Sequence, residues 1–297
     1  MGTIRLLQLT YLCTLPIEIW HMEHEADTAA TFQEEISSFR DVRLRDLSDL
    51  GLIKSISRRR NLGKQFQVKA AAIINSRFQH VLFLDSDNIP TRDPSFLFAT
   101  PEYKHKGAIF WPDFWKTASE NKIFRLLEIS SENVWEQESG QILIDKERHW
   151  IPLQLAWYMQ YYHELYFKLL NGDKDTFQYA WRALDAPFHR IQTFLSMAGL
   201  LYMDGEDDTP LFIHANLMKQ MPRHVFNQRP WHWIKRHRGD RSSVILPQFY
   251  MAMNNTLGCM DFPLQKDLDD FDQLLPHFQK AYFESGGIGG YNTYIES

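Results

Sequence analysis

The chain is poor in the features that mark several common protein classes. Among 297 residues it has only Cys13 and Cys259, so neither a disulfide framework nor a cysteine-based zinc site can form, and one bond between the two is the only possible disulfide. No apolar run approaches the roughly 18 residues that a membrane-spanning helix needs. The first residues carry a single basic side chain and no clear cleavage site, which makes a poor signal peptide.

The chain also lacks an excess of positive charge. The net charge is -5, which excludes the broad basic face that nucleic-acid binding usually needs. Hydrophobic residues make up 44% and charged residues 23%, as in ordinary globular proteins of one large domain or two small ones. Aromatic residues are plentiful at 14%, with nine Trp. A large core and stacking on sugar rings both use such side chains, so both interpretations stay open.

The most informative pattern lies at residues 80–94. The uninterrupted apolar run at residues 81–84 predicts a strand that is buried on both faces. Asp85 and Asp87 follow directly, at the end of a strand where open α/β sheets place their ligands. Carboxylate oxygens are the ligands that Mg²⁺ and Mn²⁺ prefer. An acidic turn without function is the alternative for such a pair taken alone.

A histidine supplies a third candidate ligand. His214 follows the apolar residues 210–213, which predict the end of another strand. An imidazole can complete a metal site that two carboxylates begin. The sequence therefore predicts a metal centre of Asp85, Asp87 and His214, with a non-ligating histidine as the alternative.

Strand and helix patterns alternate along the chain. This alternation predicts an α/β fold, with a mostly parallel sheet flanked by helices and ligands at the carboxyl ends of its strands. Further strands are expected at residues 15–20, 107–111, 142–145 and 199–204, and helices at residues 31–39, 65–77, 150–170, from 174 onward and 267–283. The glycine-rich C-terminus reads as a flexible tail.

The string at residues 80–94 resembles the DxD signature of GT-A-type glycosyltransferases, which have a Rossmann-like fold. From residue 15 to residue 232 the chain looks like the fungal α-mannosyltransferases that build mannan side branches. The other matching strings, in the same order, are WPDFW at 111–115, ESGQ at 138–141, GDKD at 172–175 and HAN at 214–216. The resemblance implies a retaining transferase, located in the Golgi lumen, that moves mannose from GDP-mannose to an α-mannoside acceptor with Mn²⁺ or Mg²⁺ as cofactor.

The resemblance also implies roles for individual residues. Lys69 would lie near the diphosphate, and Glu138 would act on the acceptor hydroxyl or, in a covalent route, as nucleophile. The route favoured by the sequence is front-face attack without a covalent intermediate. Asp173 is also a natural helix N-cap. The catalytic residues implied are Glu138, Gln141, Asp173 and Asp175, and the substrate-binding residues are Lys69, Trp111, Asp113, Trp115, Gly140 and Lys174.

In the resembled family, residues 15–20 would be the second strand, so the first strand and the membrane anchor are expected to be missing. The glycosyltransferase domain would then be residues 1–237, N-terminally incomplete, with residues 238–297 as an extension packed on it. Two other functions stay open. One is an inactive remnant that binds sugar nucleotides. The other is a haloacid-dehalogenase-like phosphatase, although Asp87 is followed by Asn-Ile where that class has Thr or Val one residue on.

Overall fold

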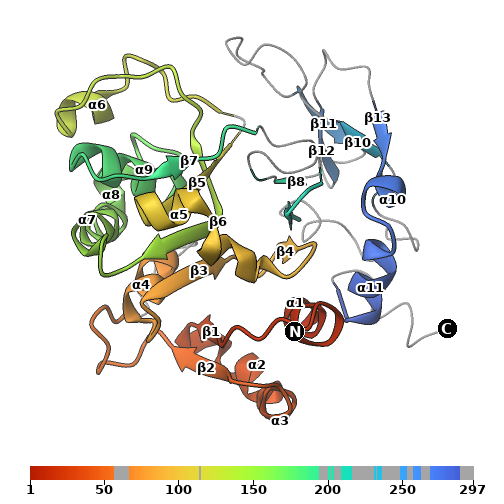
Figure 1. Cartoon of the computed structure of the whole chain (residues 1–297). Helices are drawn as coiled ribbons and strands as arrows, with labels where there is room; N and C mark the ends of the chain where they lie inside the picture. Colours follow the sequence, from red (N-terminus) through yellow and green to blue (C-terminus); the bar gives the residue numbers. More distant parts are fainter. Residues whose placement is uncertain are drawn as a thin grey trace.

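A four-stranded sheet lies at the centre of the molecule (Figure 1). Its order is β3 (His80–Leu84), β6 (Gln137–Asp145), β5 (Ala108–Pro112) and β7 (His189–Arg190). The computed structural model describes residues 1–56, 67–113, 115–193, 200–201, 203, 209–215, 231, 233–235, 248–252, 257–261 and 268–287. The predicted α/β class is confirmed. Strands β3, β5 and β7 run in one direction, but only β5 and β7 pair in parallel, because β6 runs antiparallel between β3 and β5.

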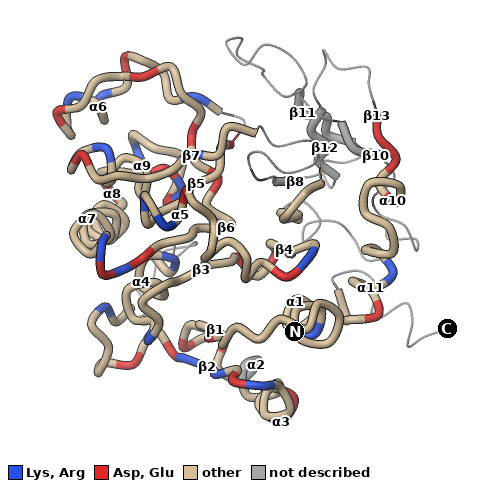
Figure 2. The backbone as a smooth tube through the Cα atoms, viewed as in Figure 1, with Lys and Arg blue, Asp and Glu red and all other residues tan. Residues whose placement is uncertain are grey.

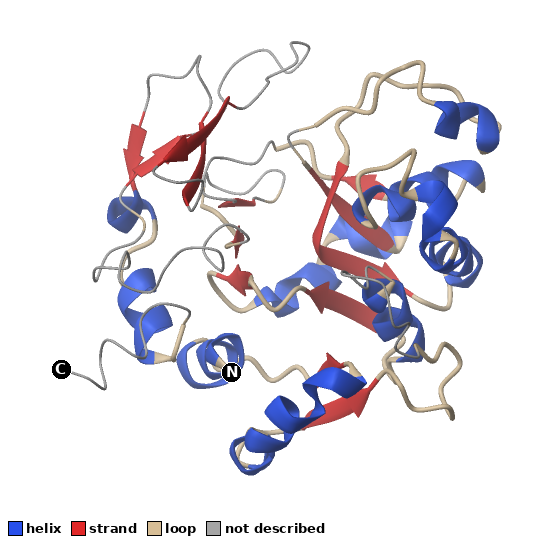
Figure 3. Cartoon of the chain, turned by 180° about the vertical axis from the view of Figure 1, so that it is seen from behind, coloured by secondary structure: helices blue, strands red, loops and turns tan. Residues whose placement is uncertain are grey.

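Helices cover one face of this sheet (Figures 1 and 3). Alternate residues of the strands, such as Phe110 and Ile142, point into a core that these helices close. The helices are α4 (Val68–Asn75), α7 (Trp150–Tyr161), α8 (His163–Tyr166) and α9 (Lys174–Ala183). In α9, Phe177 and Trp181 are fully buried at helical spacing, as predicted, and Phe110 packs edge-on against Trp181.

The other residues of the same strands face a second core. Trp111 and Leu143 pack there against Phe212, beneath η3 (Pro94–Ala99) and α5 (Pro101–Lys106). Phe212 belongs to a three-stranded antiparallel sheet of β4 (Asn88–Pro90), β9 (Phe212–His214) and β8 (Leu200–Leu201). Its register pairs Asn88 with His214. This small sheet therefore carries His214 to the end of β3, where the predicted carboxylates lie.

The N-terminal region forms a separate parallel pair of strands, β1 (Ile17–His21) and β2 (Val42–Asp46). Before them lie α1 (Gly2–Arg5) and the π-helix η1 (Leu6–Thr10), and between them η2 (Glu23–Glu25), α2 (Ala26–Thr31) and α3 (Gln33–Ser37). A cavity of about 760 Å³ separates β1 from β3. The prediction that β3 is buried on both faces is wrong for residues 82–84, which are partly exposed because β3 is an edge strand beside this cavity.

The C-terminal region packs against the N-terminus. Helices α10 (Phe271–Leu274) and α11 (Phe278–Glu284) contribute to a core that includes Leu6 and Ile213, and α11 contacts α1 (Figure 1). The expected helix at 267–283 is broken, because Asp270 caps α10 after the short strand β13 (Leu268–Asp270). Two antiparallel pairs complete the described strands, β10 (Trp233–Lys235) with β13 and β11 (Gln248–Ala252) with β12 (Leu257–Asp261). The domain boundary at residue 237 stays a prediction.

Three further predictions can be compared with the structure. The helix expected at 150–170 is interrupted at Tyr162. The helix expected from residue 174 onward ends at Ala183, which leaves Leu184 43% exposed. Cys13 is buried and free, so it makes no disulfide. The basic cluster at 57–60, the glycosylation sequon at 254–256 and the end of the tail from residue 288 lie outside the described residues.

Residues of positive and negative charge are interspersed along the described part of the backbone. Lysine and arginine alternate with aspartate and glutamate along the tube in Figure 2, most clearly around β2 and α3. Helix α6 (Lys122–Leu126) lies on a long surface connection between β5 and β6. Among the described helices, none has both the length and the apolar composition needed to cross a membrane.

The central position of β6 leads to a stability prediction. Ile142 is fully buried, so Ile142→Ala should lower the free energy of unfolding by about 2–5 kcal/mol, from lost burial and the cavity left behind. Ile151→Ala is the matched control, because Ile151 is 65% exposed on α7 and its truncation should change stability by less than about 0.5 kcal/mol. Urea unfolding of both variants measures the difference. Equal losses would contradict the assigned core.

Candidate metal centre and active site

The structure brings the three predicted metal ligands together. Asp85 and Asp87 follow β3, His214 ends β9, and the backbone N–H of Ala215 donates to the Asp87 carbonyl at 2.8 Å. Ligand atoms of Asp85, Asp87 and His214 all lie within 4.8 Å of one another, and His214 Nε2 is 3.4 Å from Asp87 Oδ1. Metal–ligand bonds of about 2 Å allow one ion to reach all three. Two carboxylates and one imidazole therefore fit a divalent cation such as Mn²⁺ or Mg²⁺.

Glu138 holds His214 from the other side. Its Oε2 lies 3.1 Å from His214 Nδ1, and its Oε1 accepts the backbone N–H of Gly140 at 2.7 Å. Burial alone would lower the pKa of His214, but Glu138 and Asp87 raise it to about 10. Burial alone would raise the pKa of Glu138, but His214 lowers it to about 2. A carboxylate on the second nitrogen commonly fixes a metal-binding histidine, so Glu138 is arranged to orient His214.

Gly140 makes this arrangement possible. A Cβ atom there would lie 3.0 Å from Asn88 Nδ2 and 3.0 Å from ring atoms of His214. The predicted close approach at Gly140 is therefore present, and the groups that approach are Asn88 and His214. The ESGQ string lies within strand β6.

Lys69 lies against the centre from helix α4. Its Nζ is 2.8 Å from Asp85 Oδ2 and 3.4 Å from Asp173 Oδ2, and it donates to Ser139 Oγ at 2.8 Å. Burial opposes its charge, but Asp173 and Asp85 together hold the pKa of Lys69 above its ordinary value. Asp173 occupies the N-cap position of α9, yet its side chain makes no cap hydrogen bond. It faces Lys69 instead, so capping does not explain this carboxylate.

A second charged cluster surrounds Lys174. Its Nζ lies 2.8 Å from Asp113 Oδ2 and 3.1 Å from Asp175 Oδ2, and it also pairs with Glu136. Burial opposes the Lys174 charge, but the three carboxylates hold its pKa above the ordinary value. The sequence predicted Asp113, Lys174 and Asp175 but missed Glu136, whose only signal is its place two residues before Glu138. Asp173 and Lys174 are adjacent, so the first turn of α9 joins the two clusters.

Asp175 was predicted to contact the sugar, but it lies inside the protein. Its exposed fraction is 0%. Its Oδ1 accepts the backbone N–H of Gln137 at 2.9 Å and Gln178 Nε2 at 2.5 Å. Burial raises the pKa of Asp175 to about 7, although Lys174 opposes the shift. Asp175 therefore links α9 to β6 through these hydrogen bonds, and it has no exposed surface that a sugar could contact in this structure.

Two other predicted site residues are also buried. Gln141 is 0% exposed, and its Oε1 accepts a 2.5 Å hydrogen bond from Asn88 Nδ2. Trp111 is 1% exposed, and its ring packs edge-on against Phe212 with centroids 5.7 Å apart. Trp111, named above as a substrate-binding residue, therefore offers almost no exposed surface to a sugar in this structure. Trp115, the other tryptophan among those residues, is partly exposed.

A comparison with known protein families identifies the family of this chain. A family model described as "Mannosyltransferase putative" matches residues 1–137 and 129–221. The chain belongs to this mannosyltransferase family. The match confirms the resemblance predicted from the motifs, and it favours a transferase over the phosphatase alternative.

Curated relatives support the same assignment. The α-1,2-mannosyltransferase MNN21 of Candida albicans is 31% identical over 190 residues, which are 48% of this chain and 29% of that protein. MNN5 of Saccharomyces cerevisiae is 26% identical over 194 residues, covering 46% of this chain and 33% of that protein. MNN2 of Candida albicans is 25% identical over 223 residues, covering 59% and 37%. The chain thus spans about a third of the length of the curated relatives it matches.

Solved structures show a more distant likeness. Mouse xyloside xylosyltransferase 1 in its apo form is 15% identical, with a TM-score of 0.39, and the match covers 62% of this chain and 77% of that chain. The galactosyltransferase LgtC, in complex with donor and acceptor sugar analogues, is 13% identical with a TM-score of 0.37, covering 60% and 73%.

The close packing at Gly140 can be tested by substitution. In Gly140→Ala the added methyl group must displace Asn88 or His214, so Mn²⁺ affinity should fall about tenfold or more, as when the support of a ligating histidine is lost. Calorimetric titration of metal-free protein measures this change. Gly51→Ala is the control, because a Cβ there meets only the side chain of Asp49. Unchanged affinity in Gly140→Ala would contradict the packing described.

Metal binding should also release a proton. Because the pKa of His214 is raised to about 10, its ring is protonated at pH 7 in the metal-free protein, whereas a ligating imidazole must be neutral. Binding of Mn²⁺ should therefore release about one proton per ion, and affinity should rise as pH increases from 6 towards the pKa. Titrations at pH 7 in buffers of different ionisation enthalpy count the protons.

Two histidine variants control this measurement. His214→Gln should abolish the proton release, whereas His105→Gln, on the exposed side of α5, should keep it. A binding enthalpy that is independent of buffer in the unsubstituted protein would exclude His214 as a protonated ligand.

Proposed function

We propose that this chain is a metal-dependent, retaining mannosyltransferase that uses GDP-mannose and an α-mannoside acceptor. The observation that supports it most directly is the convergence of Asp85, Asp87 and His214 in a member of a mannosyltransferase family. The curated relatives are named as α-1,2-mannosyltransferases. A glycoprotein or cell-wall mannan is the proposed acceptor, and the Golgi lumen is the proposed location.

The charge balance supports a bound cation. Four carboxylates, those of Asp85, Asp87, Glu138 and Asp173, surround Lys69 and protonated His214, which leaves two negative charges uncompensated when all four are ionised. Asp85, Asp87 and His214 would hold Mn²⁺ or Mg²⁺. The bound ion supplies a Lewis acid that neutralises the leaving diphosphate.

The chain's own side chains can share this electrostatic work. Breaking the anomeric C–O bond places negative charge on the diphosphate and positive charge on the sugar. The Lys69 ammonium, 2.8 Å from Asp85, is available to stabilise the negative charge. Asp173, in contact with Lys69, is the predicted catalytic carboxylate that remains a candidate for stabilising the positive charge. Lys69 and Asp173 thus form a pair of opposite charges at one edge of the centre.

The contacts of Glu138 bear on stereochemistry. Both of its carboxylate oxygens are engaged, one with His214 and one with the Gly140 N–H. A carboxylate that attacks the sugar needs a free oxygen directed at the anomeric carbon. Both oxygens of Glu138 are already in contact with other groups, so Glu138 is better suited to orienting His214. We therefore favour front-face attack, with the leaving GDP assisting deprotonation of the acceptor and the α configuration retained.

Donor binding tests the proposed function. With Mn²⁺ present, GDP-mannose should stabilise the protein by about 2.7 kcal/mol at one hundred times its Kd, and UDP-sugars should stabilise it less. Asp87→Asn should remove the Mn²⁺-dependent part, because an amide cannot supply the lost charge. Thermal-shift titrations measure both effects. The control Asp49→Asn, in an exposed turn, should behave as the unsubstituted protein.

Several results would count against this function. Larger shifts with UDP-sugars would exclude GDP-mannose as the donor, and unchanged affinity in Asp87→Asn would exclude the metal centre. No shift with any sugar nucleotide would reject the function as a whole.

A protein that binds the sugar nucleotide without turnover is the second candidate. It is favoured by the burial of Gln141 and Asp175, two of the four predicted catalytic residues. Incubation with GDP-mannose and an α-mannoside separates the two functions. A transferase forms GDP and an extended mannoside, whereas a binding protein gives the thermal shift alone.

A further inference from the structure

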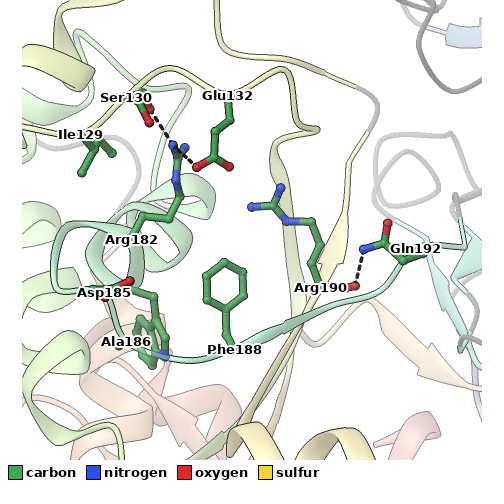
Figure 4. Close-up of a pocket in the computed structure, with 10 residues that line it drawn as sticks. Ile129, Ser130, Glu132, Arg182, Asp185, Ala186, Phe188, Arg190 and Gln192 are labelled. Atoms are coloured by element: carbon green, nitrogen blue, oxygen red, sulfur yellow. Dashed lines mark hydrogen bonds and ion pairs between the residues drawn. The ribbon is translucent and has the colours of Figure 1, made fainter.

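A second cavity, of about 550 Å³, lies at the C-terminal end of α9 (Figure 4). Its walls come from the end of α9, from β7 and from the connection that leads to β6. None of the site residues predicted from the sequence lines it. The polar and charged residues around it are Ser130, Glu132, Arg182, Asp185, Arg190 and Gln192.

One of its two arginines has a counter-charge. Arg182 Nη2 donates to the Ser130 carbonyl at 2.7 Å and lies 3.1 Å from Glu132 Oε1. Its guanidinium carbon also lies 5.5 Å from the centre of the Tyr179 ring. Arg182 is therefore part of the wall and already has its counter-charge.

Arg190 has no such counter-charge. Its Nη2 donates to Gln178 Oε1 at 3.0 Å, and its guanidinium carbon lies 5.6 Å from the centre of the Phe188 ring. Gln178 cannot offer more, because its own Nε2 donates to Asp175. Within the described part of the chain, no carboxylate lies within ion-pair distance of Arg190. Figure 4 shows its guanidinium directed into the cavity.

This arrangement is costly unless an anion completes it. Burial lowers the pKa of Arg190, and the nearby positive charge of Arg182 lowers it further. The carboxylates of Glu132 and Asp175 offset these shifts only in part, and the guanidinium stays charged at neutral pH. A partly buried cation without an anionic partner destabilises the protein. The neutral amide of Gln178 supplies one hydrogen bond and no charge. The cavity in front of Arg190 has room for an anion, and a bound anion would compensate the charge of Arg190.

We propose that this cavity binds an oxyanion, the phosphate ester or carboxylate group of a small ligand, through paired hydrogen bonds with Arg190. The planar guanidinium fork matches both groups, and the Phe188 ring offers an apolar face beside them. Glu132 and Asp185 are the competing negative charges in the lining. Asp185 is exposed, and the Glu132 side chain is 52% exposed and paired with Arg182. The site is independent of the metal centre and of the proposed transferase function.

Anion titration tests the site. The metal-free 297-residue chain is titrated by calorimetry with inorganic phosphate and, separately, with acetate at constant ionic strength. Arg190→Gln should weaken binding about tenfold or more, the loss expected for a charge-assisted hydrogen bond. Arg125→Gln makes the same charge change on the exposed side of α6 and should have no effect. Tighter binding of phosphate identifies a phosphate ester as the ligand class, and tighter binding of acetate identifies a carboxylate.

Glu132→Gln keeps the test decisive if Arg190→Gln fails to fold. Because the Glu132 side chain is half-exposed, the variant should remain folded, and loss of the competing carboxylate should strengthen anion binding. Absence of binding by the unsubstituted protein would overturn the proposal. So would a Glu132→Gln affinity equal to that of the unsubstituted protein, or an unchanged affinity in folded Arg190→Gln.

Discussion

Carboxylates packed within a few ångströms of one another repel, and this fold can hold them there because two largely buried lysines lie among them. Lys69 pairs with Asp85 and Asp173, and Lys174 pairs with Asp113 and Asp175. Each ammonium loses water on burial, and ion pairs with its carboxylates recover most of that free energy, with Ser139 adding a hydrogen bond at Lys69. The lysines come from α4 and α9, which cover the same face of the central sheet. The packing of that one helical layer therefore sets the electrostatics of the whole site.

Strand β6 imposes the second constraint. It runs against its neighbours, so one strand presents core residues along its middle and site residues at its N-terminal end. Glu138 can reach His214 because Gly140 leaves room for the ring beside the strand. Because β6 runs antiparallel between β3 and β5, it places Glu138 where this side chain can orient His214.

The sequence carried enough local information to identify the candidate metal residues. Asp85, Asp87 and His214 each follow an apolar run, and the end of a strand can be recognised without knowing its neighbours. The local sequence does not show which of the residues implied by the resemblance stay exposed to solvent. Asp175 and Gln141 lose their surface because α9 and β4 pack on β6, which is a tertiary event. The interruption of the helix at Tyr162 had no local signal either, and the part played by Glu136 had none beyond its place two residues before Glu138.

The gap between β1 and β3 has a consequence for how the molecule opens. A two-stranded sheet has little stability by itself, and β1 and β2 share no strand hydrogen bonds with the central sheet in the described structure. Their stability comes from side-chain packing, as where Met22 and Leu47 join the core beneath α4. The N-terminal pair can therefore unfold locally as a unit while the metal residues stay in place. Backbone amides of β1 and β2 would then exchange with solvent well before those of β5 and β6.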